Sequence, residues 1–298
     1  MSQKSHRLLT PTTNPIPLLS SPLTQRYSIA HTLVVPLYYY IRGTYLIADP
    51  FITLLRDLAV VAVLQCAFCA VCLPQAGAWV SGTSGGPILE GTSSMAGRAK
   101  GKGAVSGTGS LRRKNIPGAG GSSKGAGEGN WRGRIMPTLF SLILTLTLPP
   151  LPLTLLALVL GAPLYPTSSL PLTLLLSLHV SLLAFLPLFY THGVSATAWR
   201  DISAAWLPFD GAGAWGGSVG TFVGGWIGAI PIALDWDRDW QAWPCTVVWG
   251  VVAGWMVGRL LTGVLGWGVG RRIDLSEKEE EEIVLVERRD EVGAEKED

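Results

Sequence analysis

Three aspartates alternate with a tryptophan and an arginine inside the segment GGWIGAIPIALDWDRDWQAWP, residues 224–244. Carboxylate oxygens suit Mg²⁺ or Ca²⁺, so Asp235, Asp237 and Asp239 are candidate ligands of a divalent cation. The competing interpretation is structural, because tryptophans at this density are typical of a membrane interface. There the carboxylates and Arg238 can bond the exposed ends of helices and one another. We favour the structural interpretation and predict no metal site.

Thiols and an imidazole also fall within apolar stretches. Cys66, Cys69 and Cys72 stand three residues apart, but no fourth ligand accompanies them, so packing is favoured over metal ligation. Lipid attachment to Cys72 is a further alternative. His179 lies in the middle of an apolar stretch, where an ionisable residue is a functional candidate. We expect it instead to be a neutral imidazole bonded to a neighbouring helix.

Catalytic motifs occur only as chance matches in glycine-rich sequence. Residues 211–216 fit G-x-G-x-x-G, but no strand precedes them. Ser84 and Ser218 each stand in G-x-S-x-G without the strand–turn–helix context that exposes a nucleophile. Arg200 and Asp201 are more typical of an interfacial anchor than of a catalytic pair. We therefore expect no catalytic residue and no cofactor.

The composition of the chain indicates the class of fold that positions these residues. The chain has 298 residues, of which 15% are charged, and residues 135–199 contain no Asp, Glu, Lys or Arg. A soluble domain carries about 25% charged residues because its surface must be solvated. The 12 tryptophans, 36 glycines and 20 prolines also favour a membrane protein. No ten-residue alternation indicates a barrel, so the predicted fold is an all-α multi-pass membrane protein.

About six stretches are long enough to cross the hydrocarbon core, which takes about 20 apolar residues. They form two blocks, residues 29–73 and 135–272. The first pair is the least regular because four charges crowd its turn, and the first segment has the alternative of lying in the interface. Prolines 149, 150 and 152 interrupt the third stretch. The six stretches are residues 29–48, 51–73, 135–160, 170–190, 213–234 and 244–266.

The remaining segments are polar. Residues 1–28, the basic Gly/Ser-rich linker 74–134 and the acidic tail 273–298 are expected to be disordered. Lys and Arg concentrate in these segments and in the 191–211 loop, which predicts that all four face the cytosol. The loop 235–243 then faces the opposite side. Basic residues do not alternate with aromatics as on a nucleic-acid surface, so no nucleic-acid partner is expected.

Glycines recur every fourth residue in the last two stretches. Residues four apart share one helix face, and glycine there lets two helix backbones approach closely. The favoured interpretation is that the two stretches pack on each other as a hairpin. The alternative is that one glycine face docks a helix of a partner. The glycines are Gly216, Gly220, Gly224, Gly228, Gly250, Gly254 and Gly258.

Residues 224–244 resemble the signature of the PIG-F family, approximately G-A-W-x-G-A-x-P-I-P-L-D-W-[DE]-R-x-W-Q-x-W-P. Ala233 stands where the family often has proline, and Gly225 precedes the tryptophan directly. The strong match covers about twenty residues, and residues 135–268 agree more loosely in size and hydropathy. The matched positions are Gly225, Trp226, Gly228, Ala229, Pro231, Ile232, Leu234, Asp235, Trp236, Asp237, Arg238, Trp240, Gln241, Trp243 and Pro244.

The resemblance implies a role in glycosylphosphatidylinositol (GPI) anchor synthesis in the endoplasmic-reticulum membrane. PIG-F proteins are non-catalytic subunits that stabilise the enzymes transferring ethanolamine phosphate from phosphatidylethanolamine to mannoses of the GPI precursor. The implied partners are those catalytic subunits and membrane lipids. The expected partner or lipid interface consists of Trp226, Pro231, Asp235, Trp236, Asp237, Arg238, Trp240, Gln241, Trp243 and Pro244.

The main alternative is a lipid phosphoethanolamine transferase that acts on its own. Such enzymes use a motif of the type D-G-x2-A-R-x8-G-x3-D-x3-D. Asp210 and Gly211 begin like it, but the arginine and the later aspartates do not follow. A third class, a transporter or lipid scramblase, predicts charged residues within the spans or a repeat between halves, and neither is clear in the sequence.

Overall fold

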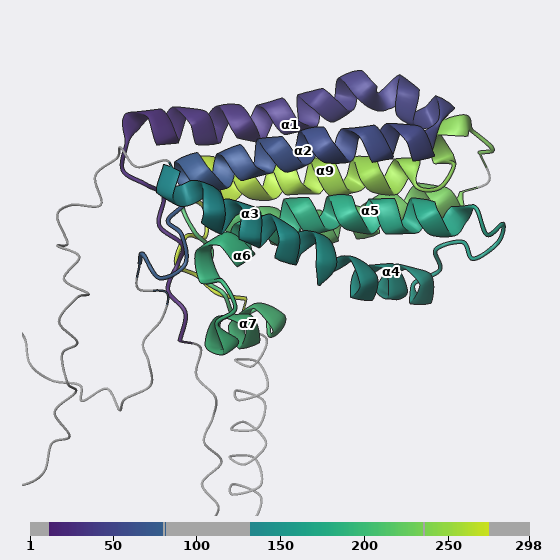
Figure 1. Cartoon of the computed structure of the whole chain (residues 1–298). Coiled ribbons are helices and arrows are strands. Elements are labelled where there is room, and N and C mark those ends of the chain that lie inside the picture. Colours follow the sequence, from purple (N-terminus) through teal and green to yellow (C-terminus); the bar gives the residue numbers. More distant parts are fainter. Residues whose placement is uncertain (1–11, 80, 82–131, 235, 274–298) are drawn as a thin grey trace, which may run out of the picture.

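The computed structural model describes residues 12–79, 81, 132–234 and 236–273, and their regular elements are helices. The long helices lie side by side in one bundle (Figure 1). The α-helices are α1 (Pro22–Ala48), α2 (Pro50–Cys72), α3 (Arg132–Thr147), α4 (Pro150–Val159), α5 (Ser169–Ala184), α6 (Leu186–His192), α7 (Ala196–Ser203), α8 (Ala214–Ala229) and α9 (Cys245–Arg259). Three shorter turns of helix are η1 (Ile230–Ala233), η2 (Asp239–Gln241) and η3 (Leu260–Val264).

Fewer helices than expected are both long and apolar enough to cross a membrane. Within the described ranges four qualify: Pro50–Cys72, Gly133–Val159, Ala214–Ala233 and Cys245–Val264. The pair α5–α6 makes a fifth if its two helices, bent by 44°, form one span. By length and composition, the described residues therefore contain four or five candidate membrane spans, against an approximate expectation of six. The first expected stretch is missing from this count although α1 has 27 residues, because polar residues lower its apolar content.

The prolines of the third stretch act as the sequence predicts. Helix α3 ends at Thr147 and α4 begins at Pro150. Proline lacks the N–H that an interior helical position needs, but it fits the first turn, where that N–H has no helical partner. The prolines therefore interrupt the span without ending it.

The N-terminal boundary differs from the prediction of a disordered segment over residues 1–28. Helix α1 begins at Pro22, and the chain before it runs along the bundle, where the Leu19 N–H donates to the Cys72 carbonyl (3.1 Å). Buried Asp201 accepts from the N–H groups of Thr12 (2.9 Å) and Thr13 (3.0 Å). Residues 1–11, 82–131 and 274–298 lie outside the described residues, so the predictions for them stay predictions.

The charges at the turn between α1 and α2 bond to one another. Buried Asp57 accepts from Arg42 Nε (3.0 Å) and from the Tyr38 hydroxyl (2.7 Å). Asp49 caps α2 by accepting from the Ile52 N–H (3.1 Å). An ion pair with an added hydroxyl donor lowers the cost of placing these groups beside apolar helices. The crowded turn is therefore compatible with two adjacent antiparallel helices.

His179 and the cysteines pack inside the bundle. The His179 Nε2–H donates to the Leu54 carbonyl (3.0 Å), which leaves Nδ1 to accept from the Tyr39 hydroxyl. This histidine thus bonds α5 to α1 and α2, as an uncharged imidazole would. Cys69 and Cys72 are fully buried among apolar side chains. In the part of the chain that the structure describes, no group of three or more His, Cys, Asp or Glu residues could hold a metal.

Candidate functional site

The glycine faces of α8 and α9 meet each other. A Cβ added to Gly220 would overlap the Gly254 carbonyl oxygen, and one added to Gly224 would overlap that of Gly250. All seven glycines predicted from the four-residue spacing lie in this contact, which we call the glycine seam. Backbones this close gain extensive van der Waals contact, which is the main attraction between helices in lipid. The two helices therefore form a hairpin held by backbone-to-backbone packing.

Asp210 fixes the start of this hairpin. Its buried carboxylate accepts from the N–H groups of Ala214 (3.0 Å) and Trp215 (2.7 Å). These groups open α8 and have no partner within the helix. Burial raises the pKa of the Asp210 carboxyl, and the two N–H bonds oppose that rise. Asp210 is therefore a helix cap here, although its sequence resembles the start of a transferase motif.

Arg259 fixes the far end of α9 to the rest of the bundle. It is fully buried, and its Nε donates to the Thr32 hydroxyl (3.0 Å). Its guanidinium lies 3.9 Å from the centre of the Phe68 ring. A charged side chain inside a membrane bundle is costly unless such partners accompany it. Arg259 was not among the residues predicted from the sequence, although a lone charge within an apolar span is a signal that could have identified it.

Gln241 holds the turn between α8 and α9. Its Nε2 donates to the carbonyls of Pro231 (2.7 Å) and Leu234 (2.9 Å), and its Oε1 accepts from the Arg238 N–H (2.9 Å). One buried amide thus satisfies three backbone groups on both sides of the turn. Side chains that bond the backbone in this way fix irregular segments that no helix ladder supports. We call residues 230–244 the signature turn.

The signature turn is also bonded to neighbouring helices. Trp243 Nε1 donates to the Thr173 hydroxyl of α5 (3.1 Å). Pro244 is buried directly before α9. The sulfur of the next residue, Cys245, lies 3.6 Å from the Leu46 carbonyl oxygen of α1. These contacts place the turn at the same end of the bundle as the α1–α2 turn and the start of α5. We call this the turn end.

The other predicted interface residues face outward. Trp236 and Trp240 are 55% and 38% exposed, their ring centres lie 5.9 Å apart, and Trp226 on α8 is 78% exposed. The exposed side chains of Asp237 and Arg238 have no bond or ion pair to another described residue. Asp235 lies outside the described residues. The mutual bonding expected for these charges is therefore not found in the part of the turn that is described.

The site thus has an inner and an outer part with different chemistry. Gln241 and Trp243 point inward and determine the shape of the turn. The outer part, with Trp236, Trp240 and Arg238, offers aromatic faces, an indole N–H and a cation. Exposed tryptophan and arginine are the residue types that most often dominate protein interfaces. This surface is suited to binding rather than to moving protons or activating a nucleophile.

Comparisons with known proteins are consistent with one another. A family model described as "GPI biosynthesis protein family Pig-F" matches residues 30–263. Aspergillus fumigatus has a protein named "Glycosylphosphatidylinositol anchor biosynthesis protein 11" that is 33% identical over 279 residues, covering 91% of this chain and 89% of that protein. A Neurospora crassa protein of the same name is 33% identical over 257 residues, covering 86% of this chain and 81% of that protein.

A human protein named "GPI ethanolamine phosphate transferase, stabilizing subunit" is 42% identical over a shorter region of 45 residues. That region covers 15% of this chain and 20% of the human protein. No solved structure matches the chain.

Proposed function

The chain belongs to the PIG-F family of GPI biosynthesis proteins, and we propose that it is a non-catalytic membrane subunit that stabilises an ethanolamine phosphate transferase. The name of the human relative, a stabilising subunit of a GPI ethanolamine phosphate transferase, supports this role. We propose that its direct partner is a catalytic transferase subunit and that it resides in the endoplasmic-reticulum membrane. The substrate of that partner would be the mannosylated GPI precursor, with phosphatidylethanolamine as donor.

One observation carries the assignment of the contact surface. Trp236 and Trp240 stand next to each other and are exposed, while the turn beneath them is held by Gln241 and by Trp243. The two exposed rings are therefore not needed for the shape of the turn. Rigidly presented tryptophans bind a partner with little loss of conformational entropy. We assign the partner contact to these two rings and to Arg238 beside them.

The test compares exposed aromatic side chains at one end of the molecule. Trp236→Ala and Trp240→Ala each remove the exposed part of an aromatic side chain, which when fully buried covers about 150–250 Å². Tyr165→Ala is the matched control, because Tyr165 is 89% exposed and precedes α5 at the same turn end. Each variant is expressed in cells that lack the natural chain, and associated transferase subunits are quantified after detergent purification.

We expect both tryptophan variants to lower the amount of associated transferase, and GPI-anchored proteins on the cell surface to fall with it. Tyr165→Ala should leave both unchanged. If the tryptophan variants keep full partner abundance but lose transfer of ethanolamine phosphate, the turn acts in chemistry or substrate binding. The stabilising role would then give way to the alternative of an enzyme acting on its own.

A further inference from the structure

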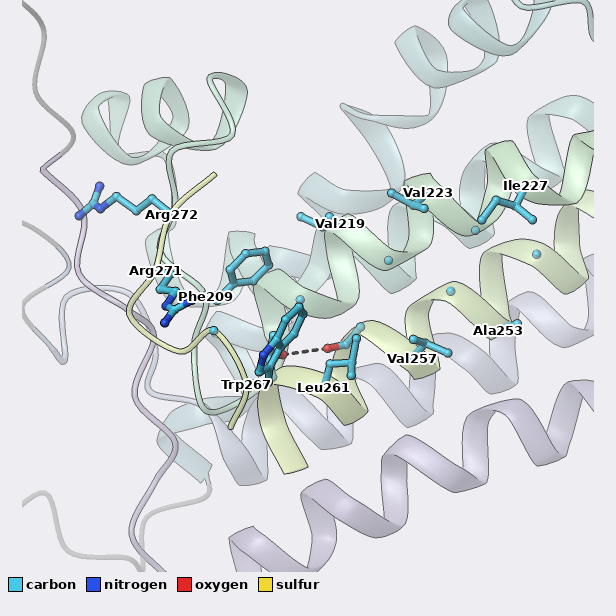
Figure 2. A pocket seen from close by; sticks show the side chains of 18 residues that line it. Phe209, Val219, Val223, Ile227, Ala253, Val257, Leu261, Trp267, Arg271 and Arg272 are labelled. Carbon is cyan, nitrogen blue, oxygen red and sulfur yellow. Dashed lines mark hydrogen bonds between the residues drawn. The ribbon is translucent and has the colours of Figure 1, made fainter. Parts of the chain in front are cut away.

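The glycine seam leaves an apolar groove on the outer side of the α8–α9 hairpin. The groove has a volume of about 590 Å³. Glycines form its floor, and its walls are larger residues one position before them, as Figure 2 shows for Val219, Val223 and Ile227 on α8 and for Ala253 and Val257 on α9. The groove therefore exists because the floor lacks side chains that the walls have. It offers apolar contact along several helical turns.

One end of the groove is polar. Phe209 and Trp267 line that end, and Arg271 and Arg272 lie beyond them (Figure 2). Arg272 is occupied, because its guanidinium donates to the carbonyls of Trp206 (3.0 Å) and Thr13 (2.6 Å). The exposed Arg271 side chain has no hydrogen bond or ion pair to another described residue. The groove thus ends at a cation to which no described residue is bonded.

The backbone holds this cation in place. The Phe209 N–H donates to the Arg271 carbonyl (2.9 Å), and the Arg271 N–H donates to the Gly268 carbonyl (2.9 Å). The Gly270 N–H donates to the Phe209 carbonyl (2.8 Å). The two bonds of Phe209 tie the segment after η3 to the loop before α8, and the bond between Arg271 and Gly268 closes a turn within that segment. Arg271 is therefore positioned at the groove by ordered chain.

The surrounding charges strengthen the attraction for an anion. Arg26, Arg134 and Arg200 lie at the same end of the bundle, which we call the arginine end. Its acidic residues among the described ranges are Asp201 and Asp210, and both are buried with their oxygens already bonded. Each carboxylate is matched by a cation of its own, Asp201 by Arg200 (2.6 Å) and Asp210 by the nearby buried Arg259, so the remaining arginines leave this end positive. Basic pockets between membrane helices are a known way to hold anionic headgroups.

From this geometry we infer that the groove binds an anionic phospholipid of the bilayer, with one acyl chain along the glycine seam and the phosphate at Arg271. An acyl chain contacts apolar walls without needing hydrogen bonds, and a negative headgroup complements the charge of Arg271. A helix of a partner protein would cover the apolar walls but would need an acidic residue of its own to complement Arg271. The inference concerns lipid binding by the chain itself and goes beyond the proposed transferase partner.

The test uses the purified full chain in mild detergent, with native mass spectrometry to measure binding of phosphatidylserine against phosphatidylcholine. Arg271→Gln removes the cation, and Arg26→Gln is the matched control at the same arginine end. Ala253→Phe fills the groove from an exposed wall position, and Val63→Phe adds the same ring to an exposed position on α2. Thermal unfolding in detergent checks that all four variants fold like the natural chain.

We expect phosphatidylserine to bind more tightly than phosphatidylcholine, and Arg271→Gln to weaken its binding about fivefold, the effect of one basic residue near an anionic surface. This loss should shrink in high salt, which screens the charge. Ala253→Phe should weaken the binding of both lipids. Arg26→Gln should weaken phosphatidylserine binding much less than Arg271→Gln does, because Arg26 does not line the groove, and Val63→Phe should change little. Equal binding of both lipids, or equal losses in Arg271→Gln and Arg26→Gln, would overturn the inference.

Two further results would also overturn it. If Ala253→Phe lowers the amount of co-purified transferase but leaves lipid binding unchanged, a partner helix occupies the groove. If phosphatidylserine binds only after residues 274–298 are removed, the acidic tail of the same chain occupies Arg271. Lipid binding is measured on the purified chain without a partner. A negative result there is therefore distinguishable from a failure of the proposed subunit role.

Discussion

Gly220 and Gly254 oppose each other across the α8–α9 hairpin so closely that a Cβ on either residue would overlap the carbonyl oxygen of the other. The contact is reciprocal, so neither helix can give way by moving a flexible side chain. The obstacle on each side is backbone, which moves only together with its helix. The spacing of the two helices therefore depends on the absence of two methyl groups.

This relationship predicts the effect of adding one methyl group. Gly220→Ala should lower stability, because overpacking costs about 1–3 kcal/mol, which exceeds the roughly 1 kcal/mol that alanine gains over glycine in a helix. Thermal unfolding in detergent measures the change. Gly211→Ala is the control, since a Cβ there meets nothing within 4 Å. Equal unfolding temperatures in the two variants would show that the seam is not tightly packed.

The turn should depend on Gln241 rather than on its charged neighbours. Gln241→Leu removes three hydrogen bonds to backbone groups, and a net loss of about 1 kcal/mol per bond is typical. Hydrogen exchange of the amides in residues 230–244 should accelerate. Asp239→Asn changes an exposed side chain of the same turn and should leave exchange unchanged. Faster exchange in Asp239→Asn, with none in Gln241→Leu, would contradict the assignment.

Trp243 and Thr173 should be energetically coupled. Trp243→Phe keeps most of the ring and removes the N–H that donates to the Thr173 hydroxyl, while Thr173→Val removes the acceptor. A double-mutant cycle of unfolding free energies should give a coupling of about 0.5–1.5 kcal/mol. Additive losses from the two substitutions would show that the turn is not held to α5 through this bond.

The segment before α1 should loosen in acid. Burial raises the pKa of the Asp201 carboxyl, but bonds from Thr13, Arg200 and Thr12 outweigh it and leave the pKa below its usual value. A carboxyl with a lowered folded-state pKa stabilises the fold above its unfolded value of about 3.9. The stabilisation is lost as the pH falls through the folded-state pKa.

Hydrogen exchange of residues 12–19 should therefore rise at low pH, after correction for the intrinsic exchange rate. Asp201→Asn should raise it already at pH 7, because the amide has no charge to attract the Thr12 and Thr13 N–H groups. Ser203→Ala, on the exposed face of the same helix, is the control. Unchanged protection of residues 12–19 from hydrogen exchange in Asp201→Asn would show that this carboxylate does not anchor the segment.

Glycosylation mapping tests the orientation. The arginine end should face the cytosol, because short loops rich in Lys and Arg stay on that side. An acceptor site inserted with sufficient spacer between residues 160 and 168, at the turn end, should be modified in the lumen. A site inserted at residues 100–110 should stay unmodified. The reverse pattern would invert the topology.

Local signals in the sequence predicted most of the helices. Hydropathy located α2, α8 and α9, and Pro149 and Pro150 marked the break between α3 and α4, because both depend on nearby residues only. The bend between α5 and α6 was not predicted, although Pro187 lies in the first turn of α6. A proline at the start of a helix fits a straight entry as well as a bent one, so the sequence alone does not distinguish them.

The sequence motif located the signature turn, but it did not show which residues of the turn are buried and which are exposed. The motif contains Gln241 and Trp236 alike, and only the path of the turn makes one buried and the other exposed. Arg259 is visible in the sequence as a lone charge in an apolar span, but its partners, Thr32 and Ser28, precede it by 227 and 231 residues and could not be predicted. Contacts at that separation leave no periodic pattern in the sequence. Long-range polar bonds are therefore what the structure adds.

The bond from Arg272 to the Thr13 carbonyl joins residues 259 positions apart. At a synthesis rate of about 5–20 residues per second, Thr13 leaves the ribosome on the order of 10–50 s before its partner. The bond to Arg272 cannot form until the last membrane helix has been made and placed, whereas the bonds of Thr12 and Thr13 to Asp201 can form earlier. Complete docking of this segment is therefore a late event that reports the completion of the bundle, and a chain stalled after α8 would hold the segment by fewer bonds.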